Sequence, residues 1–210
     1  MGSVAKQLGL AGLAMLVMVP VAQAQRWRAS LTPFAGAFIP TKNLSQVTIT
    51  AGGVDVSAAG KMKAGATFGA KINLSSRGRL GIEAGYFYAS SKVGLTILNG
   101  VLGTERDGSV QGGLLRATFR ATDGQTDTDV YFAAGLSGQK LSSDAFRLGQ
   151  EKFNIGGSVG AGLRLAVSPQ VAIRFDGDAN LYSWRFRTGL PSTSQLDLLL
   201  TAGLELRLSR

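Results

Sequence analysis

The stretch QVAIRFDGDANLYSW, residues 170–184, decides between the folds open to this chain. Every second position in its centre is charged or polar: Arg174, Asp176, Asp178 and Asn180. The positions between them are apolar or small, so the period of two indicates a β-strand with one polar and one apolar face. In a soluble sandwich the polar face would meet water. In a membrane barrel the apolar face meets lipid and the polar face lines the interior.

Seven further segments alternate in the same way. In the clearest of them, Met62 and Ile72 share the apolar face and Lys71 lies on the polar face. The first segment is the least clear, because Phe34 and Phe38 oppose its other apolar residues. The eight segments cover approximately residues 28–39, 61–74, 79–89, 115–120, 129–139, 153–167, 170–184 and 195–208.

The connections between these segments alternate in length. Three are tight turns, at residues 75–78, 122–127 and 168–170, with the Gly, Ser, Asp and Pro residues that turns favour. The other four are longer, at roughly residues 40–60, 90–108, 142–151 and 185–194. Short turns at one end and long loops at the other are typical of an up-and-down meander with an even number of strands.

The pattern therefore predicts an all-β fold, an eight-stranded antiparallel up-and-down transmembrane β-barrel. The apolar faces continue for long enough to cover the ~9–11 residues of a tilted membrane strand. A soluble lipocalin-like barrel has the same number of strands with an apolar interior and a charged exterior, and alternation alone does not exclude it. Strand length, loop alternation and the mixture of acids and bases on the polar faces favour the membrane barrel.

Two of the long connections keep strand-like alternation of their own. These are SQVTITAGGVDVSAAG, residues 45–60, and KVGLTILNGVLG, residues 92–103. We expect them to extend as hairpins beyond the membrane.

Composition narrows the domain organisation and the chemistry. The 210 residues include 29 Gly and 5 Pro, which suits one all-β domain, and the chain has no Cys and no His. Disulfides and thiolate metal sites are thereby excluded, as is the commonest general base. The formal net charge of +9 comes from residues dispersed along the chain. We predict no cofactor, no metal site and no enzymatic activity.

The first 24 residues read as a secretory signal peptide, with residues 25–210 forming the barrel domain. Lys6 precedes an apolar run from Leu8 to Val19, and Ala22-Gln23-Ala24 forms a small-x-small cleavage site. Twelve helical residues reach about 18 Å, which is short of a ~30 Å hydrocarbon layer. Because the chain is exported, we predict no nucleic-acid partner.

Two short motifs suggest chemistry but lack its context. GGSVG, residues 156–160, matches the G-x-S-x-G nucleophile motif, yet it lies inside a predicted strand and no His exists to activate Ser158. DGDAN, residues 176–180, imitates the start of a calcium loop, but Arg187 stands where the bidentate Glu should be. Ion pairs inside the barrel explain these acids better.

The inward faces predict a network of charges. An eight-stranded barrel is only just wide enough for side chains to fill it, and buried charges persist when they are paired. We expect a lumen charge network of Glu83, Arg116, Arg120, Arg164, Arg174, Asp176, Asp178, Glu205 and Arg207.

Aromatic and basic residues gather toward the predicted loop side. The aromatics Tyr86, Tyr88, Phe153, Tyr182 and Trp184 suggest an interfacial girdle. The basic residues Lys61, Lys63, Lys92, Lys152, Arg185 and Arg187 form a rim that either is solvated or contacts phosphates of lipopolysaccharide. Outer-membrane lipid and lipopolysaccharide are the expected partners.

The last predicted strand, TAGLELRL, residues 201–208, resembles the terminal assembly signal of small Gram-negative outer-membrane barrels. That group includes the transmembrane domain of outer membrane protein A, the OmpX-like barrels and the general outer membrane protein β-barrel family. The matching residues are Thr201, Gly203, Leu206 and Leu208, with Leu208 replacing the usual aromatic. The resemblance implies export through the periplasm, recognition by the barrel assembly machinery and location in the outer membrane.

For function we expect a non-enzymatic structural, adhesion or interaction role through extracellular loops that bind a ligand of unspecified identity. The alternative is a narrow channel or importer of small or apolar solutes, for which apolar loop residues would form a mouth.

Overall fold

The structure is a computed structural model that describes residues 27–51, 54–76, 79–97, 102–122, 127–143, 153–184 and 192–208. The predicted signal peptide lies outside these residues. Within them, no helix is long and apolar enough to cross a membrane.

All regular structure in the described residues is β. The strands are β1 (Trp27–Pro40), β2 (Asn43–Ala51), β3 (Val54–Met62), β4 (Gly65–Ser76), β5 (Leu80–Ile97), β6 (Leu102–Arg120), β7 (Thr128–Ser143), β8 (Phe153–Ala166), β9 (Val171–Trp184) and β10 (Thr193–Arg207).

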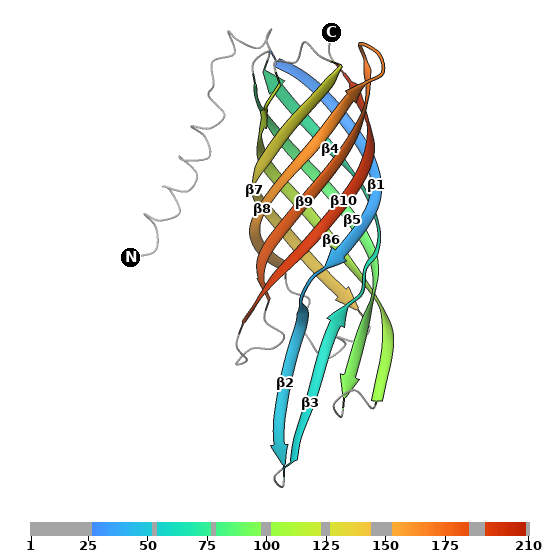
Figure 1. Cartoon of the computed structure of the whole chain (residues 1–210), viewed down its shortest axis with the longest axis vertical. Coiled ribbons are helices and arrows are strands. Elements are labelled where there is room, and N and C mark those ends of the chain that lie inside the picture. Colours follow the sequence, from blue (N-terminus) through green and yellow to red (C-terminus); the bar gives the residue numbers. More distant parts are fainter. Residues whose placement is uncertain are drawn as a thin grey trace, which may run out of the picture.

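Eight of these strands close into the antiparallel up-and-down barrel that the sequence predicts (Figure 1). The order around the barrel is β1-β4-β5-β6-β7-β8-β9-β10, and β10 pairs back onto β1. β1 begins and β10 ends at the end that holds the tight turns, which we call the turn end and which is uppermost in Figure 1. The opposite end, where the long connections lie, is the loop end.

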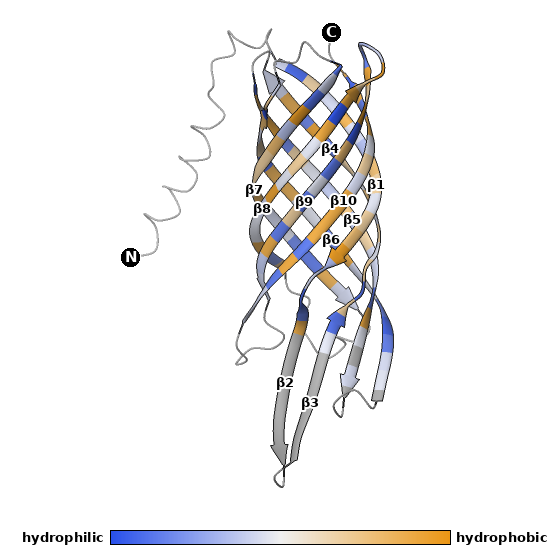
Figure 2. Cartoon of the chain, in the orientation of Figure 1, coloured by the Kyte–Doolittle hydropathy of each residue, from blue (hydrophilic) through white to orange (hydrophobic). Residues whose placement is uncertain are grey.

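The polar faces of the strands point into the barrel and the apolar faces point outward. Along β9 the buried residues alternate with more exposed apolar or small residues, so Arg174 and Asp176 point into the barrel and Phe175 points outward. Many apolar side chains on the other strands are also exposed, including Phe68, Leu115, Leu136 and Leu200. Figure 2 shows hydrophobic and hydrophilic residues alternating along the barrel strands. A one-residue slip of β9 would turn its charges to hydrocarbon, at ~2–4 kcal/mol for an Arg near the midplane.

The alternation of β1 was unclear in the sequence because this strand carries apolar side chains on both of its faces. Phe34 and Phe38 are buried inside the barrel, whereas Ala35 is exposed outside it. The two phenylalanines are therefore part of the filling of the barrel.

The first long connection forms a hairpin of β2 and β3 that extends beyond the loop end (Figure 1). β3 also pairs with the outer part of β5, from Ala59↔Thr96 to Met62↔Val93. β5 and β6 continue past the barrel as a second extension, paired as far as Ile97↔Leu102. Both extensions agree with the alternation in their sequences.

Two expectations about outward residues are wrong. Met62 belongs to β3 and is buried at 2% exposure, because the chain leaves β3 at Lys63 before it enters the barrel wall as β4. Tyr182 and Trp184 lie on the inner face of β9 and are buried, so they are not part of an outer girdle. Tyr86 and Phe153 are exposed on the outer face, as a girdle requires.

Candidate functional site: the barrel interior

The middle of the lumen holds a closed ring of alternating cations and carboxylates. We call it the central ring, and its members are Lys71, Glu83, Arg116, Arg174, Asp176 and Asp178. β4, β5 and β6 supply the first three and β9 supplies the last three. Since β5 and β9 are four strands apart in an eight-stranded barrel, the ring crosses the full width of the lumen.

Glu83 joins two arginines on one side of this ring. Arg116 Nη2 donates to its Oε1, and Arg174 Nη2 donates to its Oε2 at 2.8 Å. The Glu83 side chain has no exposed surface. A carboxylate so buried is stabilised when both oxygens accept charge-assisted hydrogen bonds, as they do here.

Lys71 closes the ring on the other side. Its Nζ donates to Asp176 Oδ2 at 2.7 Å and to Asp178 Oδ2 at 2.9 Å. Arg174 Nη2 reaches Asp176 Oδ1 at 3.3 Å, and Arg116 Nη1 donates to Asp178 Oδ1. Each of the six groups thus contacts two of opposite charge.

A smaller group of charges, the turn-side cluster, lies nearer the turn end. Arg164 donates from Nη1 to Asp129 Oδ2 at 3.2 Å and from Nε to Glu205 Oε1 at 3.0 Å. Arg174 Nη1 lies 3.9 Å from Glu205 Oε2, which connects the cluster to the central ring. Charged contacts therefore continue from the middle of the lumen toward the turn end.

Little space remains between the two groups of charges. A cavity of about 20 Å³ lies among residues of both, including Arg174, Tyr131, Arg164 and Glu205. That volume is close to the minimum that holds one water molecule. The lumen is therefore bridged by side chains at this depth.

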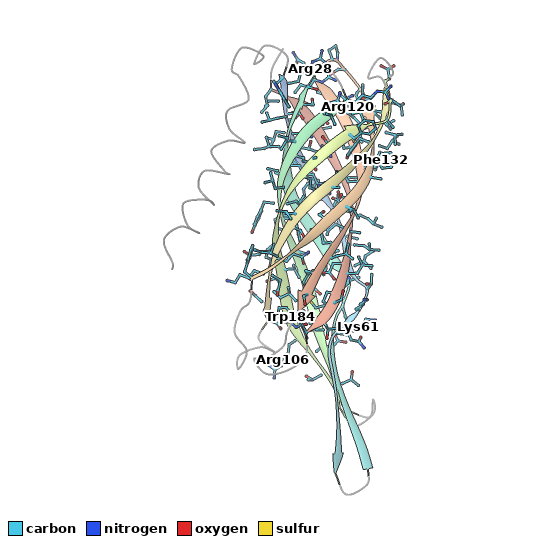
Figure 3. The ribbon with its side chains drawn as sticks, turned by 90° about the vertical axis from the view of Figure 1, so that its left-hand side faces the viewer. Arg28, Lys61, Arg106, Arg120, Phe132 and Trp184 are labelled. Atoms are coloured by element: carbon cyan, nitrogen blue, oxygen red, sulfur yellow. The ribbon has the colours of Figure 1, made fainter. Side chains whose placement is uncertain are left out.

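Two of the expected network residues bond differently. Arg120 Nη2 donates to Ser75 Oγ at 3.1 Å, and Arg207 Nη1 donates to the Pro169 carbonyl oxygen at 2.9 Å. Both lie near the turn end, and Figure 3 shows Arg120 there beside Arg28. The other seven expected residues lie in the central ring or the turn-side cluster.

The expected list omitted three residues that the structure brings into these contacts. Lys71 and Asp129 lie on the polar faces of their strands, so alternation was a sufficient signal for both. Tyr131 accepts hydrogen bonds from Arg174 Nη2 at 2.6 Å and Nε at 3.0 Å, and the guanidinium carbon lies 4.7 Å from the centroid of its ring. The same polar-face signal applies to Tyr131, but only the folded barrel shows that it contacts Arg174.

Glycines on β8 make room for these side chains. A Cβ at Gly160 would lie 2.1 Å from Asp178 Oδ1, and one at Gly162 would lie 2.2 Å from Tyr131 Oη. The space beside the small inward residues of this strand is therefore occupied by charged and aromatic side chains of the adjacent strands β7 and β9.

The loop half of the lumen holds a cluster of buried apolar residues beside polar ones such as Gln139, Gln195 and Asp197, and the sequence did not predict this cluster. Its buried residues come from most of the barrel strands and from the β2–β3 hairpin: Phe34, Phe38, Leu44, Met62, Phe87, Ala89, Val93, Val110, Leu114, Leu141, Tyr182, Trp184 and Leu199. We call this group the loop-side apolar cluster. Figure 3 shows Trp184 toward the loop end, away from Arg28 and Arg120. The signal was weak because Val93 and Met62 lie in segments read as loop or as lipid-facing strand.

The two motifs that suggested chemistry are both part of the barrel wall. Ser158 is buried on the inner face of β8, 3.5 Å from Arg116 Nη1. Asp176 and Asp178 bind Lys71 and the arginines of the central ring. Among the residues described here, no group of His, Cys, Asp or Glu is arranged to hold a metal ion.

The residues of the assembly signal lie on both faces of β10. Thr201 is buried, and Gly203 faces inward beside Phe34 of β1. Leu206 is half-buried on the outer face, and Leu208 is exposed. The Leu208 amide donates to the Ala29 carbonyl oxygen at 2.9 Å, so the end of the signal is attached to β1.

Solved structures with the same fold are outer-membrane proteins. Neisserial surface protein A aligns with a TM-score of 0.55 and 18% identity over 85% of this chain and 96% of that one. OprG from Pseudomonas aeruginosa aligns with a TM-score of 0.60 and 11% identity, over 88% and 97%. AlkL aligns with a TM-score of 0.53 and 12% identity, over 87% and 91%. These identities are too low to show more than the fold.

Comparison with curated proteins gives no match. The model of the outer membrane protein beta-barrel domain family matches residues 11–201, most of the chain. This match agrees with the closed eight-stranded wall and its apolar outer face. The chain belongs to the outer membrane protein β-barrel domain family, and it is a protein of the Gram-negative outer membrane.

Proposed function

We propose that this protein is a non-enzymatic outer-membrane scaffold that holds two β-hairpin extensions outside the cell for binding. Short turns of outer-membrane barrels face the periplasm and longer loops face outward, so the loop end is the extracellular end. The observation on which the proposal rests is that β2–β3 and the β5–β6 extension leave the barrel as paired strands joined to each other by β3 and β5. Such a paired extension presents a more ordered surface than a free loop.

The filled interior supports the same function. The central ring and the turn-side cluster bridge the lumen, and the loop-side apolar cluster packs in the half nearer the loop end. A barrel that is closed in this way is better suited to holding a surface than to passing solutes.

Binding by the β2–β3 hairpin can be tested with a shortened variant. Residues 46–59 would be replaced by Asn-Gly, a favoured two-residue hairpin turn. Leu44 and Met62 stay in place because both pack in the loop-side apolar cluster. The protein is refolded into lipid nanodiscs and added to the probes. These are cultured epithelial cells and immobilised fibronectin, laminin and collagen. We expect the full-length protein to bind at least one probe and the shortened variant to lose that binding.

A matched control shortens the other extension by joining Gly94 to Glu105 through the same turn. It shows whether the two hairpins act together, and heat-modifiable gel migration shows that each variant is folded. Binding that survives the loss of both hairpins would contradict the proposal.

The loop-side apolar cluster favours a second function, the import of small apolar solutes. Its side chains would be the first that such a solute meets on entering from outside. Uptake of a radiolabelled alkane by cells with and without the protein separates the two functions. Protein-dependent uptake together with no binding to any probe would favour import.

A further inference from the structure

The outer face of β5, β6 and β7 changes in character from the middle of the wall toward the loop end. Registered rows across the three strands show this change, and every position in them faces outward. From the middle to the loop end, the rows are Ala84–Leu115–Leu136, Tyr86–Gly113–Gly138, Tyr88–Gln111–Lys140 and Ser90–Ser109–Ser142.

The two adjacent glycines open a notch in the wall. Gly113 and Gly138 are direct partners, and Tyr86 of β5 and Ile155 of β8 flank them in the same row. A cavity of about 560 Å³ lies here and is also lined by Leu115. We call it the wall notch.

The walls of the notch are apolar and its loop-side edge is polar. Phe153 folds toward Gly138, since a Cβ there would lie 2.3 Å from the ring. At Gly113 a Cβ would meet nothing nearer than a backbone oxygen at 3.7 Å, so the space above it is open. Gln111 and Lys140 line the notch on its loop side. The Lys140 ammonium therefore lies at the loop-side edge of the apolar wall notch.

A second, polar depression continues from this edge. Its volume is about 400 Å³, and it is lined by Tyr88, Asp107, Gly108 and five serines: Ser90, Ser91, Ser109, Ser142 and Ser143. The Ser91 and Ser143 hydroxyls donate to backbone carbonyl oxygens, so Ser90, Ser109 and Ser142 are the serines that the proposal uses. Hydroxyl groups beside an aromatic ring and a carboxylate are suited to binding sugars, which present many hydroxyls and apolar ring faces. We call it the serine groove.

We propose that the wall notch and the serine groove together bind one lipopolysaccharide molecule of the outer leaflet. An acyl chain lies in the notch over Gly113 and against the Phe153 ring that covers Gly138, a phosphate meets the Lys140 ammonium, and core sugars contact the serine groove. The order of the three surfaces along the strands matches the order of acyl chain, phosphate and sugar in that molecule. The loop end faces outward, which puts this tract in the leaflet where lipopolysaccharide resides.

A phospholipid matches less of this surface. It would fill the notch and reach Lys140, but it has no sugar for the serines. The inference does not depend on the proposed binding by the hairpins, and each can fail alone.

The test uses the refolded full-length chain in uncharged detergent micelles, with native mass spectrometry to count bound lipid. The probes are core-bearing lipopolysaccharide, lipid A without core sugars, and phosphatidylglycerol of matched acyl length. We expect one lipopolysaccharide per barrel, weaker binding of lipid A, and the weakest binding of phosphatidylglycerol.

Gly113→Leu fills the notch and should weaken lipopolysaccharide binding about tenfold, the effect of about two buried methylene groups. The matched control is Gly157→Leu on β8, another outward glycine, whose Cβ would lie 3.9 Å from its nearest neighbour. It should bind like the unmodified protein. If Gly113→Leu fails to give a heat-modifiable barrel, Gly113→Ala replaces it, with an expected weakening of about threefold.

Two further variants test the polar parts. Lys140→Gln should weaken both lipopolysaccharide and lipid A about three- to tenfold, whereas Arg28→Gln, at the exposed turn end, should not. Ser109→Val should weaken core-bearing lipopolysaccharide and leave lipid A unchanged. Equal binding by the Gly113 and Gly157 variants, or phosphatidylglycerol binding as tight as that of lipopolysaccharide, would overturn the proposal.

Discussion

Lys71 shows how much can depend on one side chain inside a barrel. It is 1% exposed, and its ammonium is shared between two aspartates of β9, three strands away around the barrel. Without it, Asp176 and Asp178 would each keep one arginine, while the carboxylates would lose the cation between them. Breaking a buried pair in this way costs more than the pair contributes, because an uncompensated charge remains.

We therefore expect Lys71→Met to destabilise the folded barrel by ~3–5 kcal/mol. Urea unfolding of the refolded protein in micelles, followed by tryptophan fluorescence, measures the difference. Lys92→Met, at an exposed position on the outer face of β5, is the control and should change the free energy of unfolding by less than ~1 kcal/mol. A similar small effect for both lysines would show that the central ring contributes little to stability.

The neighbours Leu163 and Arg164 test the two faces of β8. Leu163→Arg would place a charge in lipid at ~2–4 kcal/mol and should block membrane assembly. Alternation alone predicts that Arg164→Leu is tolerated, since that side chain points inward. The contacts with Asp129 and Glu205 change this expectation, because Leu would remove the Arg164 guanidinium from both carboxylates. We expect Arg164→Leu to assemble with a lower urea midpoint, and Arg164→Lys to recover part of the loss.

The same residues show what a sequence can reveal about a barrel interior. A period of two assigns Glu83, Arg116 and Asp178 to the inner face without any structure. It does not tell which of them meet, because partners such as Lys71 and Asp176 are brought together by strand tilt and stagger around the closed wall. For that reason Arg120 and Arg207 were grouped with carboxylates although they bond to Ser75 and a backbone carbonyl.

At the scale of elements, alternation located the eight barrel strands and anticipated both extensions. It misplaced Met62 because a strand that leaves the barrel and the strand that follows it can share one continuous alternating pattern. Only the pairing of β3 with β5 shows that the pattern belongs to two different strands. The loop-side apolar cluster was missed for a related reason, since part of it comes from the extensions.

The two extensions are also connected by an exposed ion pair. Lys63, at the junction of β3 and β4, donates a hydrogen bond to Glu105 on β6. That hydrogen bond, together with the charge of the ammonium, lowers the pKa of the Glu105 carboxyl from its ordinary value of 4.5. The contact is therefore fully present above about pH 4.5, and it is lost as the pH falls through the lowered pKa.

We expect faster hydrogen exchange in the β5–β6 extension below that pH, after correction for the intrinsic pH dependence of exchange. Hydrogen exchange with mass spectrometry, measured from pH 3 to pH 7, gives the profile. Glu105→Gln should remove the step, while Asp107→Asn serves as a nearby control that keeps it. A profile without a step in the unmodified protein would show that the ion pair does not hold the extension.

At the scale of the whole molecule, the closed lumen predicts that the barrel does not conduct ions. The central ring spans the barrel, and a cavity of about 20 Å³ lies between it and the turn-side cluster. In planar bilayers we expect refolded protein to give no stable, large, ohmic openings at neutral pH. The double variant Lys71→Ala with Arg116→Ala removes two bridging cations and should show more conductance if it folds. Large, stable openings of the unmodified protein would contradict the closed lumen and favour the importer.

The central ring also divides the chain into two complementary parts. β4, β5 and β6 bring Lys71, Glu83 and Arg116, two cations and one carboxylate, with a net charge of +1; β9 brings Arg174, Asp176 and Asp178, with a net charge of −1. The partners in the Lys71–Asp176 bond are 105 residues apart in sequence. A polypeptide cut between β6 and β7 would leave each fragment with an unbalanced set of charges that the other neutralises. The two fragments should therefore associate and assemble into one barrel, whereas neither fragment should insert stably into the membrane alone.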